Sequence, residues 1–375
     1  MKSSNTLLLH IGTPKTGTST IQDFLEINNS RLERWGWCYP VLDRSIHMND
    51  SRRHINNGNG HPLLGAYYNS KEELSCYWDE LERKLSNYSV ILSAEAFWMW
   101  FRDDHNLYER FRFFKTQYDN IKIIVYLRRQ DLLVESYWNE MIKSGVFSVD
   151  IHEMIDILER EYNLLCYYDN LKRIEQAIGR ENMIVRVFEK GQFKGGSNDL
   201  ISDFLSALDL SRKAMMKDNW VYPVVQNEGL SDFALSYALF FAKEYKEFEL
   251  KERLASVRDG FISLSDRSGE FGRGYYLTAN ERENLLNKYS CDNNRIARDY
   301  LNRDVLFYDK RIDYPMWNQY TFSKTEKEII KMHAKMAADD LIFLNRQDEC
   351  ENNGEIGLKD VFVILWAKLR HIVRS

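Results

Sequence analysis

The sequence is short of cysteine, of long hydrophobic runs and of positive charge, and each shortage excludes a class of protein. Its five cysteines are scattered and form no C-x-x-C pair, so the sequence indicates neither a disulfide framework nor a zinc ribbon. No apolar run approaches the ~20 residues that a membrane-spanning helix needs, and the N-terminus lacks the pattern of a signal peptide. We therefore expect a cytoplasmic protein in a reducing compartment.

The charge balance also limits the partners that the chain can have. Its formal net charge is −5 at pH 7, without the basic footprint that nucleic-acid binding requires, so we expect no nucleic-acid partner. The chain has 375 residues, of which 44% are hydrophobic, and this is enough for a sizeable core. Such a length suits one large domain or two small ones.

Short apolar stretches alternate with helical patterns along the first half of the chain. This alternation predicts an α/β fold, with a parallel sheet flanked by helices and a mostly helical C-terminal half. Strands are expected at 7–9, 35–40, 90–93, 121–127 and 183–188, and helices from 18 and at 72–85, 106–119, 131–143, 198–208, 229–248, 279–301 and 324–345. A glycine- and serine-bearing loop is expected at 260–277.

The last thirty residues differ in character from the rest. We assign residues 1–345 to one domain and residues 346–375 to a polar linker and an amphipathic helix. The apolar face of that helix, within 358–373, is expected to pack on the domain or on a second subunit of a homo-oligomer. Peripheral contact with a membrane, beside a lipid-linked glycan, is the alternative.

The stretch from His10 to Gln22 reads H-I-G-T-P-K-T-G-T-S-T-I-Q and has the pattern of a phosphate-binding loop. Three leucines of a predicted strand precede it, Gly12 and Gly17 make its centre a loop, and a helical pattern begins at Thr18. In such a turn the loop N–H groups and the helix N-terminus converge on an anion, and the helix dipole favours its charge. The non-functional alternative is a glycine-containing turn with a solvated lysine.

The position of the lysine distinguishes this loop from that of nucleotide triphosphatases. Their pattern, G-x-x-x-x-G-K-[ST], has the lysine directly after the second glycine. Here Thr18 and Ser19 follow Gly17, and Lys15 lies two residues before it. The sequence therefore predicts a phosphate cradle whose cation comes from within the loop.

Residues 14–19, P-K-T-G-T-S, resemble the 5′-phosphosulfate loop P-K-[ST]-G-T-[ST] of sulfotransferases, which use 3′-phosphoadenosine 5′-phosphosulfate (PAPS). The chain looks like bacterial carbohydrate-type sulfotransferases over about residues 5–305. The resemblance implies a P-loop-like fold, PAPS as the donor, adenosine 3′,5′-bisphosphate as the product and no required metal. It also implies that the cofactor is held by Lys15, Thr16, Gly17, Thr18 and Ser19.

A second candidate anion site follows another predicted strand. Arg128 ends that strand, and Ser136 lies eight residues later, about two turns into the next helix. A guanidinium fork with a hydroxyl is a good receptor for a phosphate dianion, whereas the alternative is an ordinary ion pair of Arg128 with Asp131 or Glu135. The resemblance assigns Arg128 and Ser136 to the 3′-phosphate of PAPS, and the adjacent Arg129 is a substitute for Arg128.

Lys15, Glu95 and Arg128 each follow a predicted strand, and α/β sheets bind ligands outside the carboxyl ends of their strands. We therefore expect the three residues to meet at one cleft. Lys15 is assigned to catalysis because it stands where charge builds on the leaving phosphate. Glu95 is the expected base that takes the proton of the acceptor hydroxyl, although cytosolic sulfotransferases have a histidine at the similar strand end. A structural Glu95, with His61 as the base, is the alternative.

These motifs favour a PAPS-dependent sulfotransferase that acts on a hydroxyl or amine of a glycan or glycolipid. The second hypothesis is a P-loop kinase for a small molecule or sugar, although ATP has no 3′-phosphate and the sequence shows no clear strand-terminal aspartate for magnesium. The third is a non-catalytic nucleotide-binding module. Residues 271–274, F-G-R-G, are the candidate segment for closing over the 3′-phosphate.

Overall fold

The computed structural model describes residues 5–40, 58–61, 77, 79, 88–102, 120–144, 149–194, 199–208, 219–223, 229–245, 254–267 and 272–344. The chain divides into two compact units. The first, which we call the sheet unit, comprises Met1–Leu133, Leu158–Gln226 and Asn284–Lys310; the second, the helical unit, comprises Val134–Ile157, Asn227–Glu283 and Arg311–Ser375. The domain boundary expected at residue 345 and the C-terminal helix lie outside the described residues, so both stay predictions.

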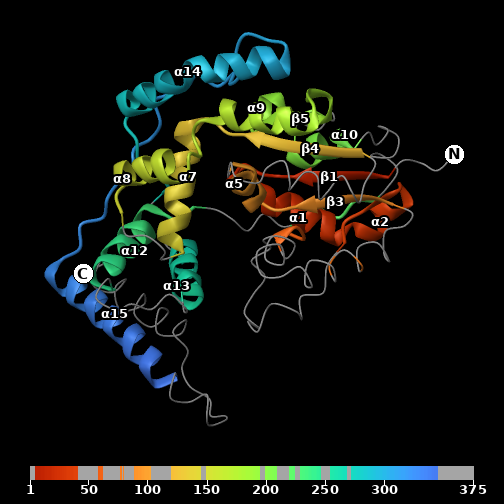
Figure 1. The fold of residues 1–375 in the computed structure, drawn as a ribbon. Coiled ribbons are helices and arrows are strands. Elements are labelled where there is room, and N and C mark those ends of the chain that lie inside the picture. Colours follow the sequence, from red (N-terminus) through yellow and green to blue (C-terminus); the bar gives the residue numbers. More distant parts are fainter. Residues whose placement is uncertain are drawn as a thin grey trace. The chain divides into compact units, whose positions relative to one another are not determined.

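A parallel five-stranded sheet forms the centre of the sheet unit, in the order β2-β3-β1-β4-β5 (Figure 1). Its strands are β1 (Thr6–His10), β2 (Trp37–Cys38), β3 (Ser89–Ser93), β4 (Asn120–Leu127) and β5 (Met183–Val187). The chain goes from β1 to the β2 side and from β4 to the β5 side. The topological switch point therefore lies between β1 and β4, where ligands of such sheets bind.

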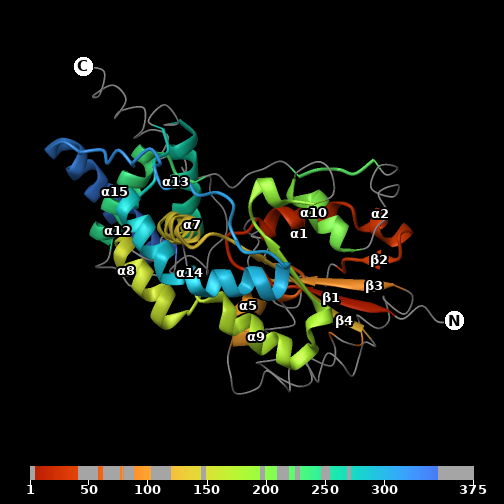
Figure 2. The same ribbon diagram turned by 90° about the horizontal axis from the view of Figure 1, so that it is seen from above.

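Helices cover both faces of this sheet, which explains why its strands are nearly continuous apolar runs. Figure 2 shows α1 (Thr18–Ile27), α2 (Asn29–Arg34) and α10 (Leu200–Ala207) on one side, and α5 (Ala96–Arg102) and α9 (Tyr167–Ile178) on the other. On the first side, a buried cluster joins Leu8 of β1 to Ile21 and Phe24 of α1 and to Phe204 of α10. The expected α/β class, with a parallel sheet flanked by helices, is confirmed.

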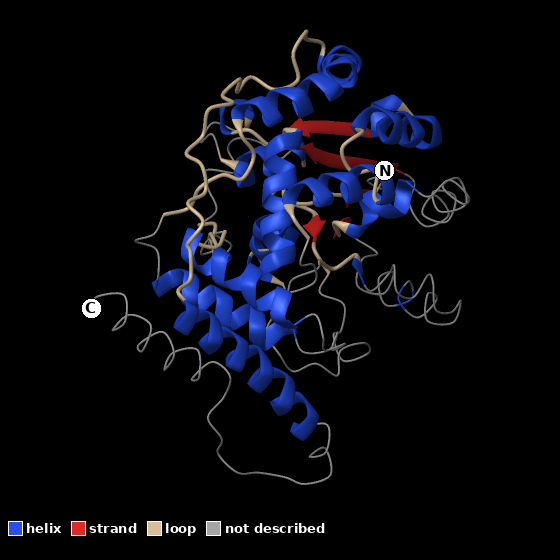
Figure 3. Cartoon of the chain, turned by 90° about the vertical axis from the view of Figure 1, so that its left-hand side faces the viewer, coloured by secondary structure: helices blue, strands red, loops and turns tan. Residues whose placement is uncertain are grey.

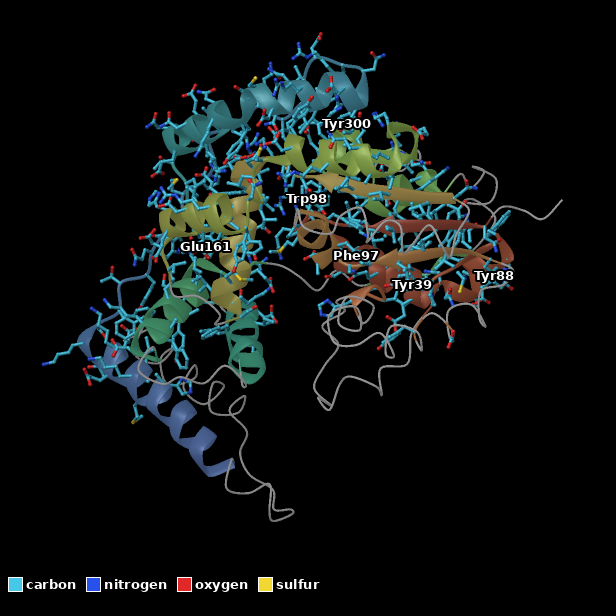
Figure 4. All side chains as sticks on the ribbon, in the orientation of Figure 1. Tyr39, Tyr88, Phe97, Trp98, Glu161 and Tyr300 are labelled. Atoms are coloured by element: carbon cyan, nitrogen blue, oxygen red, sulfur yellow. The ribbon has the colours of Figure 1, made fainter. Side chains whose placement is uncertain are left out.

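The second face is closed by aromatic and polar contacts between helices. Trp98 of α5 packs edge-on against Tyr167 of α9, with ring centroids 6.1 Å apart. The C-terminal part of α14 (Ala279–Leu301) is fastened to α9, because the Tyr300 hydroxyl donates to Glu175 (2.6 Å). Trp98 and Tyr300 are labelled in Figure 4. Helix α9 was not predicted, although the buried Tyr167, Leu171, Ile174 and Ile178 have helical spacing.

Helices make up most of the described helical unit (Figure 3): α12 (Asp232–Tyr245), α13 (Leu254–Arg267), α15 (Lys324–Leu344), α8 (Ile151–Asp156) and the later part of α7 (Gln130–Lys143). Tyr237 lies at the centre of its aromatic core, where its hydroxyl bonds to His333 Nδ1 (2.5 Å). Burial lowers the pKa of His333 to about 4, so this histidine is neutral. Among the helices that the structure describes, none is both long enough and apolar enough to cross a membrane.

The loop expected at 260–277 is wrong in its first part, because α13 continues to Arg267. Gly260 and the serines suggested a loop, since glycine and serine disfavour helices. In the structure, Phe261 and Leu264 lie one turn apart and are buried, and the Phe261 ring packs against Phe241 of α12. Ser265 accepts a hydrogen bond from the Ser231 amide (2.7 Å). Tertiary packing thus outweighs the local preference.

Candidate functional site

The loop between β1 and α1 has the backbone conformation of an anion-binding turn. Gly12, Lys15 and Gly17 all have positive φ (91°, 62° and 75°), and Gly17 caps α1 without any side-chain hydrogen bond. The loop is anchored to β4, because Thr13 donates from its amide and its hydroxyl to the Tyr126 carbonyl (both 3.0 Å). This rigid turn leaves the N-terminus of α1 open for a negatively charged group.

Two threonines of the loop have different roles. The Thr16 hydroxyl donates to the Thr13 carbonyl (2.6 Å) and so holds the loop together. The Thr18 hydroxyl is buried and has no hydrogen-bond partner in the described part of the chain. Lys15 and Ser19 are half-buried. A buried hydroxyl without a partner needs one, so the donor set of this loop fits the 5′-phosphosulfate that the sequence predicted for it.

Gly17 is required by its surroundings as well as by its φ angle. A methyl group added there would lie 2.4 Å from Leu200 Cδ2 of α10 and 3.2 Å from Phe188 Cε2, just after β5. The loop therefore packs directly against the segment between β5 and α10. At Gly12 there is room for a methyl group, which would lie 3.5 Å from Glu95 Cα, so only the positive φ favours glycine there.

Arg128 contacts the loop through its guanidinium group. Its Nη1 donates to the Lys15 carbonyl (2.6 Å), and its guanidinium carbon lies 5.5 Å from the centre of the Phe188 ring. The Tyr167 hydroxyl donates a hydrogen bond to the Arg128 carbonyl (2.7 Å). The segments that follow β1 and β4 are thereby joined at the switch point of the sheet, where the two candidate anion-binding elements lie side by side.

Arg129 and Glu135, which are close to Arg128 in the sequence, form ion pairs with other residues. Arg129 is buried, forms two hydrogen bonds with Asp131 (2.7 and 2.8 Å) and donates to the Asp309 carbonyl (2.6 Å), so it has a structural task. Glu135 forms a buried ion pair with Arg282 of the helical unit. Asp131 and Glu135 thus each pair with an arginine other than Arg128. Ser136 is half-buried in the part of α7 that belongs to the helical unit, and its assignment to the 3′-phosphate stays a prediction.

Both candidate bases lie at the end of β3. Glu95 is half-buried in the turn between β3 and α5. His61 is exposed, and the segment 58–61 that carries it is bound to β3 because the Gly60 amide donates to the Ser93 carbonyl (3.0 Å). Asn59 adds two further bonds to β3, to Ile91 and Ser93. Protein atoms that exclude solvent on one side lower the pKa of His61 below its ordinary value.

A buried polar group beneath the loop was not predicted. Ser93 Oγ bonds to His10 Nδ1 (2.9 Å) and accepts from Gln22 Nε2 of α1 (3.0 Å). Burial lowers the pKa of His10 to about 3, so the imidazole is neutral. The three residues connect β1, β3 and α1, and thereby connect the phosphate loop to the strand end that carries Glu95. A histidine and a serine that end otherwise apolar strands were the available signal.

The sequence also did not predict that residues 303–310, which we call the strap, lie beside the strand ends. The strap follows α14 and returns to the carboxyl ends of β4 and β5. Glu189, just after β5, accepts from the amides of Tyr308 (3.1 Å) and Asp309 (2.7 Å), and Arg129 binds the Asp309 carbonyl. This is a wall of the sheet unit beside Arg128. The segment 271–274 expected for that role is only partly described, and residues 272–274 belong to the helical unit.

Comparison with known proteins finds distant similarities. No model of a known protein family matches the sequence. A protein of Archaeoglobus fulgidus without an assigned function is 26% identical over 263 residues, which cover 69% of this chain and 66% of that relative, just under two thirds of its length. The crystal structure of a sulfotransferase from Alicyclobacillus acidocaldarius is 16% identical, covers 64% of this chain and 91% of that one, and superimposes with a TM-score of 0.36. Neither similarity assigns an activity to this chain.

Proposed function

We propose that the chain is a sulfotransferase that moves the sulfuryl group of PAPS to a hydroxyl or amine of a glycan or glycolipid. The observation that carries the proposal is the contact of Arg128 with Lys15 at the switch point of the sheet. It puts a second cation beside a phosphate loop, as a nucleotide with both a 5′ and a 3′ anionic group requires. The strap supplies a further wall next to Arg128.

The loop acts on the leaving group. Attack of the acceptor oxygen or nitrogen on sulfur forms one bond and breaks the bond from sulfur to the 5′-phosphate oxygen, so negative charge grows on that phosphate. Lys15, the Thr18 hydroxyl and the open N–H groups of α1 are donors for this charge. Donors fixed in place before the reaction stabilise developing charge without reorganisation.

The acceptor must also lose a proton, and we assign that task to Glu95. Its turn abuts Gly12 of the loop, and the bond between Gln22 and Ser93 fixes the strand end two residues before it. His61 is the second candidate at the same strand end. Because its pKa is lowered, His61 would be neutral and able to take a proton at pH 7.

Ligand preference separates this proposal from its alternatives. A sulfotransferase should bind adenosine 3′,5′-bisphosphate in preference to adenosine 5′-phosphate and without metal, whereas a kinase should prefer ATP with magnesium. Arg128→Ala should weaken the binding of adenosine 3′,5′-bisphosphate more than the binding of adenosine 5′-phosphate. Some loss is expected for both, because Arg128 also holds the Lys15 carbonyl.

Transfer itself is tested with labelled PAPS and a panel of glycans. Lys15→Ala should reduce turnover by ~10²–10³, the usual effect of removing one such donor. The matched control is Lys190→Ala, an exposed lysine of the same unit. Normal turnover of Lys15→Ala would remove the loop from the mechanism, and a wild-type chain that binds the nucleotide but transfers nothing would favour a non-catalytic module.

A further inference from the structure

A second group of cations lies in the sheet unit, apart from Lys15 and Arg128. It consists of Arg186 in β5, Lys194 in the segment between β5 and α10, and Arg303 at the start of the strap, and we call it the cationic cluster. Asp203 of α10 is the carboxylate among them. Asp203 is buried, accepts from the Tyr126 hydroxyl (2.7 Å) and the Lys194 amide (2.6 Å), and lies 3.4 Å from Arg186 Nε.

The donors of the cluster exceed its acceptors. The buried Arg303 Nε makes no hydrogen bond to any residue that the structure describes. The buried Arg186 Nε lies 3.4 Å from Asp203 but does not form a hydrogen bond of good geometry. The Lys194 side chain is exposed and has no ion-pair partner among those residues. Buried donors without partners are rare in native proteins and point to a water or an ion that completes them.

The electrostatic surroundings of Lys194 also indicate that positive groups outnumber negative groups in the cluster. The nearby Arg186 guanidinium is the main cause that lowers the pKa of Lys194, followed by partial burial, and Arg303 adds to the effect. Asp203 acts in the opposite direction but does not reverse the shift. The single carboxylate therefore leaves the cluster with excess positive charge.

The other acid near the cluster is bound to different groups. Glu189 accepts from the amides of Tyr308 and Asp309 and from Gln192 Nε2. Gln192 in turn accepts from Arg303, so it separates the Glu189 carboxylate from that guanidinium. Glu189 thus fixes the strap and places Arg303, and it is not a direct partner of Lys194 or Arg186 in the described residues.

We propose that the cationic cluster binds an oxyanion: a carboxylate, sulfate or phosphate group on the acceptor. The Arg186 guanidinium and the Lys194 ammonium group suit an anion with several oxygens. Arg303 adds positive charge, while its Nη atoms bond to Tyr308, Gln192 and Leu306. The segments that carry Arg186 and Lys194 lead to residues that pack against the loop between β1 and α1. Phe188, two residues after Arg186, and Leu200, six residues after Lys194, are the side chains that face Gly17. An acidic acceptor bound there would be anchored beside the donor.

Binding of the anion is tested first, without any reaction. Calorimetry measures inorganic sulfate binding to the protein in the presence and in the absence of adenosine 3′,5′-bisphosphate. Lys194→Gln should weaken binding about tenfold, as loss of one charged hydrogen bond implies. Lys190→Gln, which removes an exposed lysine from the same segment, should leave it unchanged. Sulfate binding that depends on Lys15 and not on Lys194, or no binding at all, would overturn the site.

The acceptor is tested separately, and this arm rests on the proposed function. With methyl glucuronide and methyl glucoside as paired acceptors, Lys194→Gln should raise KM about tenfold for the acidic sugar only, with kcat unchanged. Equal KM changes for both sugars would contradict an anchor for acceptor charge. If no variant transfers sulfate to any acceptor, the proposed function fails, while the calorimetry still decides whether the oxyanion site exists.

Discussion

Replacing Gly17 with alanine should destabilise the sheet unit more than the same change at Gly36, and the excess should come from Leu200. Both glycines have positive φ, +75° and +81°, so alanine at either position costs ~1–2 kcal/mol of backbone strain. At Gly36 an added methyl has no atom within 4 Å, whereas at Gly17 it would lie 2.4 Å from Leu200 Cδ2. The two positions therefore separate strain from crowding.

The size of the crowding effect depends on the atom that the added methyl group would contact. Leu200 Cδ2 is the end of a flexible side chain, so the leucine turns away and the backbone stays, at a cost of ~0.5–1.5 kcal/mol for a distorted rotamer. We expect a loss in the free energy of unfolding of ~1–2 kcal/mol for Gly36→Ala and ~2–3 kcal/mol for Gly17→Ala. Combining Gly17→Ala with Leu200→Ala removes the crowding, so the two changes should be coupled by ~1 kcal/mol.

Urea unfolding, followed by tryptophan fluorescence, measures the four variants and the wild type. Binding of adenosine 3′,5′-bisphosphate to the folded proteins is the second measurement. Gly17→Ala should weaken it because the loop N–H groups shift, and Gly36→Ala should not. Equal destabilisation at the two glycines, together with additive effects of Gly17→Ala and Leu200→Ala, would refute the packing of the loop against α10.

Two further predictions concern buried titratable groups. Because burial lowers the pKa of His10 from 6.5 to about 3, the unfolded chain binds a proton that the folded chain does not, and the free energy of unfolding should fall as the pH drops below about 6.5, by up to ~1.4 kcal/mol per pH unit. His10→Gln should flatten this dependence in unfolding curves at several pH values, and an unchanged slope would contradict a buried neutral imidazole. Glu135→Gln should cost ~3 kcal/mol or more because it leaves the buried Arg282 without its carboxylate, and thermal unfolding should show that Arg282→Met recovers part of the loss.

The sheet and the turn between β1 and α1 could be predicted because their signals are local. An apolar run such as Leu7–Leu9, bounded by glycine and followed by a helical pattern, identifies both the strand and the turn without knowledge of the rest of the chain. The strand ends then placed Arg128 and Glu95 at the same edge, since parallel strands share their carboxyl edge. The contact between Arg128 and Lys15 is the direct consequence.

Features that depend on residues far apart in the sequence could not be predicted from such local signals. Arg128 and Arg129 are adjacent and chemically identical, and only their surroundings give one to the phosphate loop and the other to Asp131 and the strap. Helix α13 could not be predicted because it is stabilised by the packing of Phe261 on α12 and not by the helix propensity of its residues. The strap has no regular pattern, since its bonds are backbone bonds to Glu189 and Arg129.

The strap also sets the order in which the protein is completed during synthesis. Arg129 and Asp309 are 180 residues apart, and two segments of the helical unit, Val134–Ile157 and Asn227–Glu283, are translated between them. The nascent chain therefore forms β4 and β5 long before the segment that covers their ends has left the ribosome. Such non-local closure is slow and leaves partly made chains open to misassembly. The segment that closes this edge of the sheet thus comes late in biosynthesis, so a fragment that stops before residue 303 should hold a sheet but lack the bonds of the strap to Glu189 and Arg129.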